Sequence, residues 1–405
     1  MFDHIKNKTL FVNRYKTNSE AIIVSCFFNP QNSPYRTSAF KHFYESIKHL
    51  NHQIIECVIG DAKPELQESK NIKRVFTKNL LWHKESLLNK LISELPDNYK
   101  YVFWLDADVI FTNLNWLTEG VEQLKYNNII QPFEHCVHLE KDENVPSFSM
   151  DKLKEADLPN QINNKVWRSF SASYATSELW KDEDYNNHGH VGFAWGAKLE
   201  ILKAVPLYEK ALIGGADHII AHAAAGQIAH SCITKSFTDN IEEVNQWSKQ
   251  FFNVVKGNIG FVKGDLYHIW HGDIEKREYL KRIQDFTAQS KNIVNRDKNG
   301  LYVTNQNDDI YMTDYFKHRE VSNNHDFSSP IFSDVIFGTA IIAGTVVETI
   351  TDILTDKDQS KQEFEEFVGR AINEVGAGAG RGNNVISVKK INDNLKSHSN
   401  SDNFS

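Results

Sequence analysis

Two aspartates directly follow an apolar run, and their spacing suits metal binding. The five apolar residues Tyr101 to Leu105 run into Asp106, and Asp108 follows after one alanine. Because side chains alternate along a strand, both carboxylates are expected to point to one side, within reach of one cation. Carboxylates so close repel each other unless a proton or a cation compensates. The pattern therefore predicts a divalent metal that also holds a diphosphate, with two solvated turn aspartates as the alternative.

A further metal ligand is expected from the segment around His268 and His271. His268 lies at the end of an apolar run, and Gly272 follows the second histidine. In a strand the two imidazoles face opposite sides, so at most one ligates the metal unless the strand breaks between them. We prefer His268 narrowly because it lies deeper in the apolar run. Two hydrogen-bonded structural histidines are the alternative.

A third motif, Gly214-Gly215-Ala216-Asp217-His218, suits the acceptor side of a group transfer. Glycines let the backbone approach a ligand closely, which makes Gly215 and His218 candidate substrate contacts. Asp217 is the candidate base that takes a proton from an acceptor hydroxyl, and a helix-capping aspartate is the alternative. The aromatic face of Trp195 suits stacking on a sugar ring, although a core tryptophan explains this residue almost as well.

Besides Asp106, three residues are candidate contacts for a nucleotide. Lys84 and Asn89 lie on a predicted helix whose leucines face inward, and either side chain is long enough to reach over a ligand. A solvated helix face is the common position for either residue alone. Phe27 lies at the end of the first predicted strand, and ligands of open α/β sheets bind beyond the carboxyl ends of the strands.

The segments that hold these residues alternate between strand and helix. Strands are expected at 21–28 and 54–60 and in the segment 101–111 that carries Asp106 and Asp108, and helices at 36–50 and 82–95. This alternation predicts a mostly parallel sheet with helical crossovers. The pattern weakens over 135–190, where a loop-rich insertion is expected. The later expected elements are a regular segment at 191–197, a helix at 198–204, a strand at 260–270 and a helix at 275–287.

In their order along the chain, these motifs resemble the GT-A glycosyltransferases, particularly bacterial and viral members with a D-x-D motif after an apolar strand. The likeness covers roughly residues 20–320 and includes the segment Tyr315–Glu320 near its end. Four spaced motifs in one order are more specific than any one of them. The resemblance implies a Rossmann-like α/β fold with a mostly parallel central sheet, flanking helices and a small C-terminal appendage.

The resemblance also implies a metal-dependent enzyme that transfers a hexose from a nucleotide-diphosphate sugar, UDP-linked as the first choice. The acceptor hydroxyl would belong to a glycan, a protein or another molecule. Asp106 would lie near the ribose and the metal, Asp108 would ligate Mn²⁺ (or Mg²⁺), and one of the two histidines would complete the site. Related enzymes often carry an acidic pair where this chain has Asp217-His218, so the base and the expected inversion stay open. The alternatives are a non-catalytic carbohydrate- or nucleotide-binding protein and an aspartate-based phosphatase.

Composition narrows the classes of partner. The 405 residues carry a formal net charge of −8 and no long Lys/Arg block, so strong nucleic-acid binding is not expected. The four cysteines form no C-x-x-C pair, which favours a reducing compartment. The first residues lack the apolar core of a signal peptide, so we expect a cytoplasmic protein.

The chain changes character near residue 325. We expect a catalytic domain at 1–325, an apolar helical appendage at 326–375 and a flexible tail at 376–405. Within 331–350, Asp334 and Glu348 enclose 13 uncharged residues. This is short of the roughly 20 needed to span a bilayer, so no transmembrane span is expected. Burial and self-association are the favoured roles of this segment, and contact with a membrane surface is the third.

Overall fold

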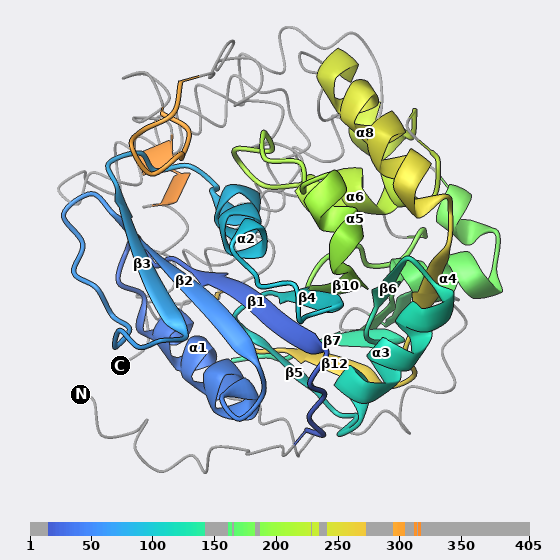
Figure 1. The fold of residues 1–405 in the computed structure, drawn as a ribbon, viewed down its shortest axis with the longest axis horizontal. Helices are drawn as coiled ribbons and strands as arrows, with labels where there is room; N and C mark the ends of the chain where they lie inside the picture. Colours follow the sequence, from blue (N-terminus) through green and yellow to red (C-terminus); the bar gives the residue numbers. More distant parts are fainter. Residues whose placement is uncertain are drawn as a thin grey trace, which may run out of the picture. The chain divides into compact units, whose positions relative to one another are not determined.

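The computed structural model describes residues 15–141, 161–163, 166–182, 187–227, 229–234, 241–272, 295–303, 312–313 and 315–316 (Figure 1). The chain divides between His325 and Asp326, and every described residue precedes this division. The helix expected at 275–287, the appendage, the tail and the self-association of 331–350 lie outside the described residues. No helix in the described part is long and apolar enough to cross a membrane.

A seven-stranded sheet forms the centre, in the order β11-β6-β10-β4-β1-β2-β3. Its strands are β1 (Ala21–Phe27), β2 (His52–Ile59), β3 (Ile72–Thr77), β4 (Tyr101–Leu105), β6 (Ile129–Gln131), β10 (Ala194–Lys198) and β11 (Ile259–Phe261). β1 pairs in parallel with β2 and β4, and β2 pairs in parallel with β3. β10 runs antiparallel to both of its neighbours. The expected α/β class and mostly parallel sheet are confirmed.

A second, five-stranded sheet has the order β5-β12-β7-β9-β8. Its strands are β5 (Val109–Phe111), β7 (His135–His138), β8 (Gln161–Asn163), β9 (Val166–Arg168) and β12 (Asp265–His268). The single strand expected at 260–270 is wrong, because β11 and β12 belong to different sheets. Gly264 lies between them with a φ of +124°, which an L side chain rarely adopts. Part of the expected loop-rich insertion also forms strands, since β7, β8 and β9 pair within this sheet.

The helices cover both faces of the central sheet (Figure 1). They are α1 (Pro34–Ile47), α2 (Lys84–Ser93), α3 (Trp116–Tyr126), α4 (Phe170–Thr176), α5 (Leu199–Ala204), α6 (Ala216–Ala224), α7 (Ser231–Thr234) and α8 (Ile241–Val255), with a 3-10 turn η4 (Leu179–Lys181). One core cluster joins α2, α5, α6 and α8 to one face, and another joins α1 and α3 to the opposite face. β1 is almost wholly apolar because both of its faces are covered.

The carboxyl ends of β1 and β4 lie side by side, which brings two chain segments to one edge of the sheet. The strands pair in parallel from Ala21 opposite Tyr101 to Val24 opposite Trp104. Near the end of this pairing, the Ser25 hydroxyl donates to the carbonyl oxygen of Leu105 at 2.8 Å. The D-x-D motif therefore begins at the edge where ligands of such sheets are expected.

Candidate functional site

Asp106 and Asp108 lie in a turn that joins the two sheets. β4 ends at Leu105 and β5 follows the turn. The Asp106 amide donates to the carbonyl oxygen of Phe193 at 2.7 Å, and the carbonyl oxygen of Asp108 accepts from the Ile269 amide at 2.8 Å. The expectation that both aspartates extend a strand is therefore wrong, because the backbone leaves strand geometry at Leu105. Each side of the turn is anchored to a different distant segment.

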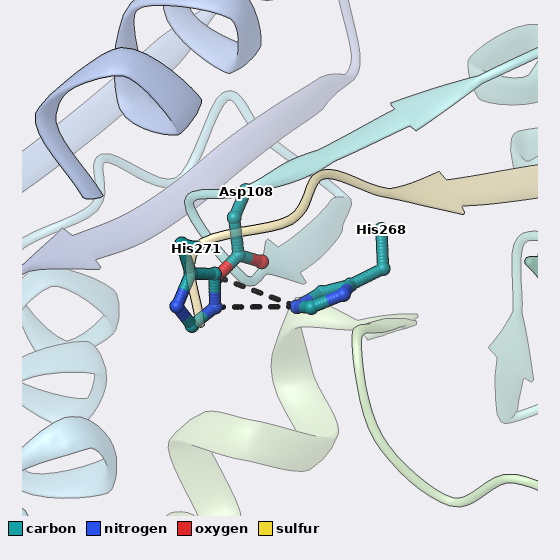
Figure 2. Close-up of side chains that lie close together, drawn as sticks. All are labelled: Asp108, His268 and His271. Atoms are coloured by element: carbon teal, nitrogen blue, oxygen red, sulfur yellow. Dashed lines mark hydrogen bonds and ion pairs between the residues drawn. The ribbon is translucent and has the colours of Figure 1, made fainter. Parts of the chain in front are cut away.

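Asp108, His268 and His271 converge on one point (Figure 2). Nε2 of His271 lies 2.9 Å from Oδ2 of Asp108, and Nε2 of His268 lies 3.9 Å from the same oxygen. The two Nε2 atoms are 3.3 Å apart. In the described part of the chain, this is the only group of three His, Cys, Asp or Glu residues whose ligand atoms all lie within 4.8 Å.

Both histidines reach Asp108 because the strand ends between them. β12 stops at His268, and the following turn leads to Gly272, which has a φ of +130°. The alternation that would separate the two imidazoles therefore no longer applies. Sequence reasoning preferred His268, whereas the structure places His271 closer to the carboxylate. Both side chains are buried, at 3% and 4% exposure.

The donor set fits a divalent transition metal. Metal–nitrogen bonds of about 2.1 Å at angles between 90° and 109° place two ligating nitrogens about 3.0–3.4 Å apart. The 3.3 Å separation of the imidazole nitrogens of His268 and His271 lies in this range. Two imidazoles and one carboxylate suit a first-row transition metal better than Mg²⁺, which prefers oxygen ligands.

Lys84 joins Asp106 to Asp217 in a second polar group. Its Nζ lies 2.7 Å from Oδ1 of Asp106 and 3.2 Å from Oδ1 of Asp217. Lys84 begins α2, and Asp217 lies in the first turn of α6. The Trp82 amide donates to the carbonyl oxygen of Leu212 at 2.7 Å and so links the segments that precede the two helices. The structure thus brings the candidate metal motif and the candidate base together through one buried ammonium.

Burial and opposite charge compete in setting the pKa values of this group. Burial lowers the pKa of Lys84, but Asp106 and Asp217 outweigh it, so the pKa is well above its usual range. Burial raises the pKa of Asp217, and Lys84 partly opposes this rise. The neighbouring Glu85, which sequence reasoning missed, has a pKa raised by burial to about 8. Asp217 is thereby a stronger base than an exposed aspartate.

The two glycines before α6 shape the approach to Asp217. Gly214 and Gly215 both have a φ of +94°, so both occupy the left-handed region that favours glycine. On the facing loop, a Cβ atom added to Gly192 would lie 3.5 Å from Oδ2 of Asp217. A side chain at position 192 would therefore contact both His190 and the candidate base.

Trp195 and Phe27 are core residues. Trp195 has no exposed surface, stacks on Trp104 at 6.4 Å and donates its indole N–H to the Val191 carbonyl oxygen at 2.8 Å. The expected stacking of Trp195 on a sugar is therefore wrong, and the core alternative holds. Phe27 is 5% exposed and packs on Phe40 with ring centroids 4.7 Å apart. The structure thus places this candidate nucleotide contact within the core as well.

Asn89 has structural partners. Its Nδ2 donates to the Leu207 carbonyl oxygen and to Oε1 of Glu209, both at 2.8 Å, and its Oδ1 accepts from the Leu207 amide at 2.9 Å. These bonds use both amide hydrogens, which favours a structural role over the expected nucleotide contact. The ring of His218 lies 5.6 Å from that of His188, and the expected substrate contact of His218 stays a prediction.

An aromatic stack beside the metal candidates was missed by sequence reasoning. The Phe193 ring lies between His190, with centroids 4.2 Å apart, and His268, with centroids 4.9 Å apart. Phe193 has a φ of +78°, a strained conformation for a residue with a side chain. His190 and Phe193 come from an irregular loop, so no periodicity in the sequence indicates the stack.

No protein-family model matches the chain, and no curated protein does. Solved structures that resemble it include glucosyl-3-phosphoglycerate synthase from Mycobacterium tuberculosis in complex with Mn²⁺, UDP-glucose and phosphoglyceric acid. This comparison has 11% identity and a TM-score of 0.32, and it covers 66% of this chain and 78% of the other. A proposed nucleotide-diphospho-sugar transferase from Desulfovibrio desulfuricans G20 has 10% identity, a TM-score of 0.29 and coverages of 63% and 83%.

Proposed function

We propose that this chain is a metal-dependent glycosyltransferase that moves a hexose from a nucleotide-diphosphate sugar to a hydroxyl acceptor. The observation that carries the proposal is the convergence of Asp108, His268 and His271 beside the Lys84-linked pair of Asp106 and Asp217. A donor set for a divalent cation and a candidate base thus meet near the carboxyl edge of the central sheet. UDP is the donor nucleotide that we would test first, with Mn²⁺ as the metal.

Each part of the site has a chemical task in this proposal. Asp108, His268 and His271 hold the cation, which when bound stabilises the charge that develops on the leaving diphosphate. An Asp217 oxygen takes the proton of the acceptor hydroxyl while the hydroxyl oxygen bonds to the anomeric carbon. The bond from that carbon to the diphosphate oxygen breaks, and the nucleoside diphosphate leaves. A single displacement of this kind inverts the anomeric configuration.

Lys84 positions both sides of the reaction. Its ammonium contacts Asp106, next to the metal candidates, and Asp217, which lies beside Gly192. Because the side chain is buried, it contributes a fixed positive charge near the point where negative charge develops. The same arrangement disfavours the phosphatase alternative, because Asp106 and Asp108 have different partners and do not form a nucleophile–acid pair.

The experiment is a thermal-shift titration of the full chain with UDP, GDP and CDP, each with Mn²⁺ or EDTA. A nucleotide at a hundred times its Kd adds about 2.7 kcal/mol to stability if it binds only the folded state. Asp108→Ala should abolish the Mn²⁺-dependent shift and keep the fold. Asp97→Ala, the matched control, removes an exposed carboxylate before the amino end of β4 and should keep the shift. Unchanged UDP affinity of Asp108→Ala in Mn²⁺ would contradict the assignment.

Release of free sugar from UDP-hexose separates an enzyme from a binding protein. The proposed transferase should hydrolyse its donor slowly in Mn²⁺ without acceptor, and Asp108→Ala should not. Binding of UDP with no release from any UDP-hexose, with or without acceptors, would favour the non-catalytic alternative.

A further inference from the structure

A second group of histidines surrounds α6, apart from the site described above. His218 and His222 lie one turn apart on α6, so both project from one side of the helix. His188 lies in the loop before β10, and His230 follows α6. The His188 ring centroid lies 5.0 Å from that of His222 and 5.6 Å from those of His218 and His230. His188, His222 and His230 are all buried.

Two of these histidines have the hydrogen bonds of metal ligands. Nδ1 of His188 lies 2.8 Å from the carbonyl oxygen of Gly189, and Nε2 of His230 lies 2.7 Å from that of Asp182. A carbonyl oxygen only accepts, so each of these nitrogens carries the proton and the other ring nitrogen keeps its lone pair. A histidine that binds a metal through one ring nitrogen typically donates the N–H of the other nitrogen to a carbonyl oxygen or a carboxylate in this way.

His222 lacks any such bond. Its side chain has no exposed surface, and neither ring nitrogen has a hydrogen-bond partner of normal geometry, although the Gln227 side chain lies next to the ring. A neutral imidazole always carries one N–H and one lone pair, and burying both without partners is unfavourable. A metal ion bonded to one nitrogen would compensate for this cost. The arrangement of His222 therefore points to a ligand at the centre of the group.

The ring positions fit a shared ion. Metal–nitrogen bonds of about 2.1 Å at angles of 90° to 120° place the centroids of two imidazoles on one metal roughly 4.6–5.6 Å apart. The three distances from His188 lie in this range, whereas the 6.5 Å between His218 and His222 is longer, so these two rings would have to move closer to bind one ion. His222 and His230 stack at 3.9 Å, so only one of them would ligate at a time. The ring nitrogens do not yet converge within 4.8 Å, so binding requires rotation about the side-chain bonds.

The group is also chemically ready for a metal. Burial lowers the pKa of His188 to about 4 and places the pKa values of His218 and His222 well below their usual range. These imidazoles are therefore neutral at pH 7 and need not lose a proton to bind. Neutral nitrogen ligands favour Zn²⁺, Ni²⁺ or Cu²⁺ over Mg²⁺ or Ca²⁺.

We propose that His188, His218 and His222 form a second, structural site for Zn²⁺. This ion would join α6 to the loops on either side of it. Because Asp217 lies in the first turn of the same helix, the ion would also stabilise the position of the candidate base. This proposal is independent of the proposed function, since it requires neither the nucleotide nor the first metal site.

The test uses Zn²⁺ as the probe and the EDTA-treated full chain. Asp108→Ala/His271→Ala, which lacks two ligands of the first candidate site, serves as the background. Isothermal titration should show one equivalent of Zn²⁺ in this background, together with a rise in Tm. Adding His222→Leu should remove the rise and weaken Zn²⁺ binding at least tenfold. Adding His52→Leu, a buried histidine outside the group, should leave both unchanged.

A second variant and a spectroscopic measurement keep the proposal testable if His222→Leu folds poorly. His188→Gln in the same background should also weaken Zn²⁺ binding, with an unchanged far-UV circular dichroism spectrum. Co²⁺ in place of Zn²⁺ should give ligand-field absorption that both variants reduce. No Zn²⁺ binding in the background, or binding that neither His222→Leu nor His188→Gln weakens, would overturn the proposal. Comparison of wild type with the background reports on the first site separately.

Discussion

Replacing Lys84 by Met tests whether its ammonium holds Asp106 and Asp217 together. Methionine keeps an unbranched side chain for packing but leaves two carboxylates facing each other without a cation. Removing one partner of a fully buried ion pair costs about 3–5 kcal/mol. Asp106 and Asp217 keep side-chain exposures of 28% and 24%, so water can partly replace the ammonium. We therefore expect a loss near the lower end, about 3 kcal/mol at pH 7.

The stability loss caused by Lys84→Met should depend on pH, and the pKa of Asp217 sets the direction of this dependence. Lys84 lowers the pKa of Asp217 against the effect of burial, so its removal raises that pKa further above the unfolded value. When the pKa of a carboxyl group is higher in the folded state than in the unfolded state, the folded protein loses stability as the pH rises above the unfolded-state pKa. The difference between wild type and Lys84→Met should therefore be small near pH 4 and grow toward neutral pH.

Urea unfolding of both proteins across this pH range measures the difference. Lys203→Met is the matched control, because Lys203 pairs with the exposed Asp97 and its loss should hardly change the midpoint. Adding Asp217→Asn to Lys84→Met should restore part of the stability by removing one of the two facing charges. Equal midpoints for the two lysine variants, or a loss that does not vary with pH, would refute the reasoning.

Two further predictions concern the backbone and the protonation of the site. Gly215→Ala places a Cβ atom at a φ of +94° and should cost about 1–2 kcal/mol and reduce acceptor-dependent transfer. Gly60→Ala, at a φ of +63° with open space around the added atom, should lose stability but keep transfer, and equal transfer by both variants would contradict a role in placing Asp217. The pKa of Glu85 rises from 4.5 to about 8 on folding, so the folded protein should lose stability as the pH rises between these two values. Glu85→Gln should remove this part of the pH dependence of stability. Parallel Tm–pH curves for wild type and Glu85→Gln would show that the carboxyl group is ionised in the folded protein.

The central sheet could be predicted because its strands are locally distinctive. β1 and β4 are continuous apolar runs followed by polar turns, which is typical of parallel strands covered on both faces. The second sheet was missed because β5, β8 and β9 have only three residues each. Three residues are too few to show the alternation of apolar and polar residues that identifies a strand. The pairing of these strands also depends on distant parts of the chain.

In the candidate site, too, the sequence shows the residue types, whereas their roles depend on contacts with distant parts of the chain. The apolar segment around Trp195 suited a core residue almost as well as a surface that stacks on a sugar, because hydrophobicity alone does not distinguish the two. Packing against Trp104 decides between them. Asn89 is a similar case, since its amide is used by a backbone segment far along the chain.

The two errors of geometry in the candidate site have one physical cause. Strand alternation was extended past Leu105 and past His268, where the backbone leaves each strand. The Ile269 amide bonds to the Asp108 carbonyl oxygen, so these two turns are held against each other. That contact directs Asp108 toward His268 and His271 together, whereas alternation would have kept the imidazoles apart. The metal candidates are thus recognisable as residue types in the sequence, but their convergence is a property of two paired turns.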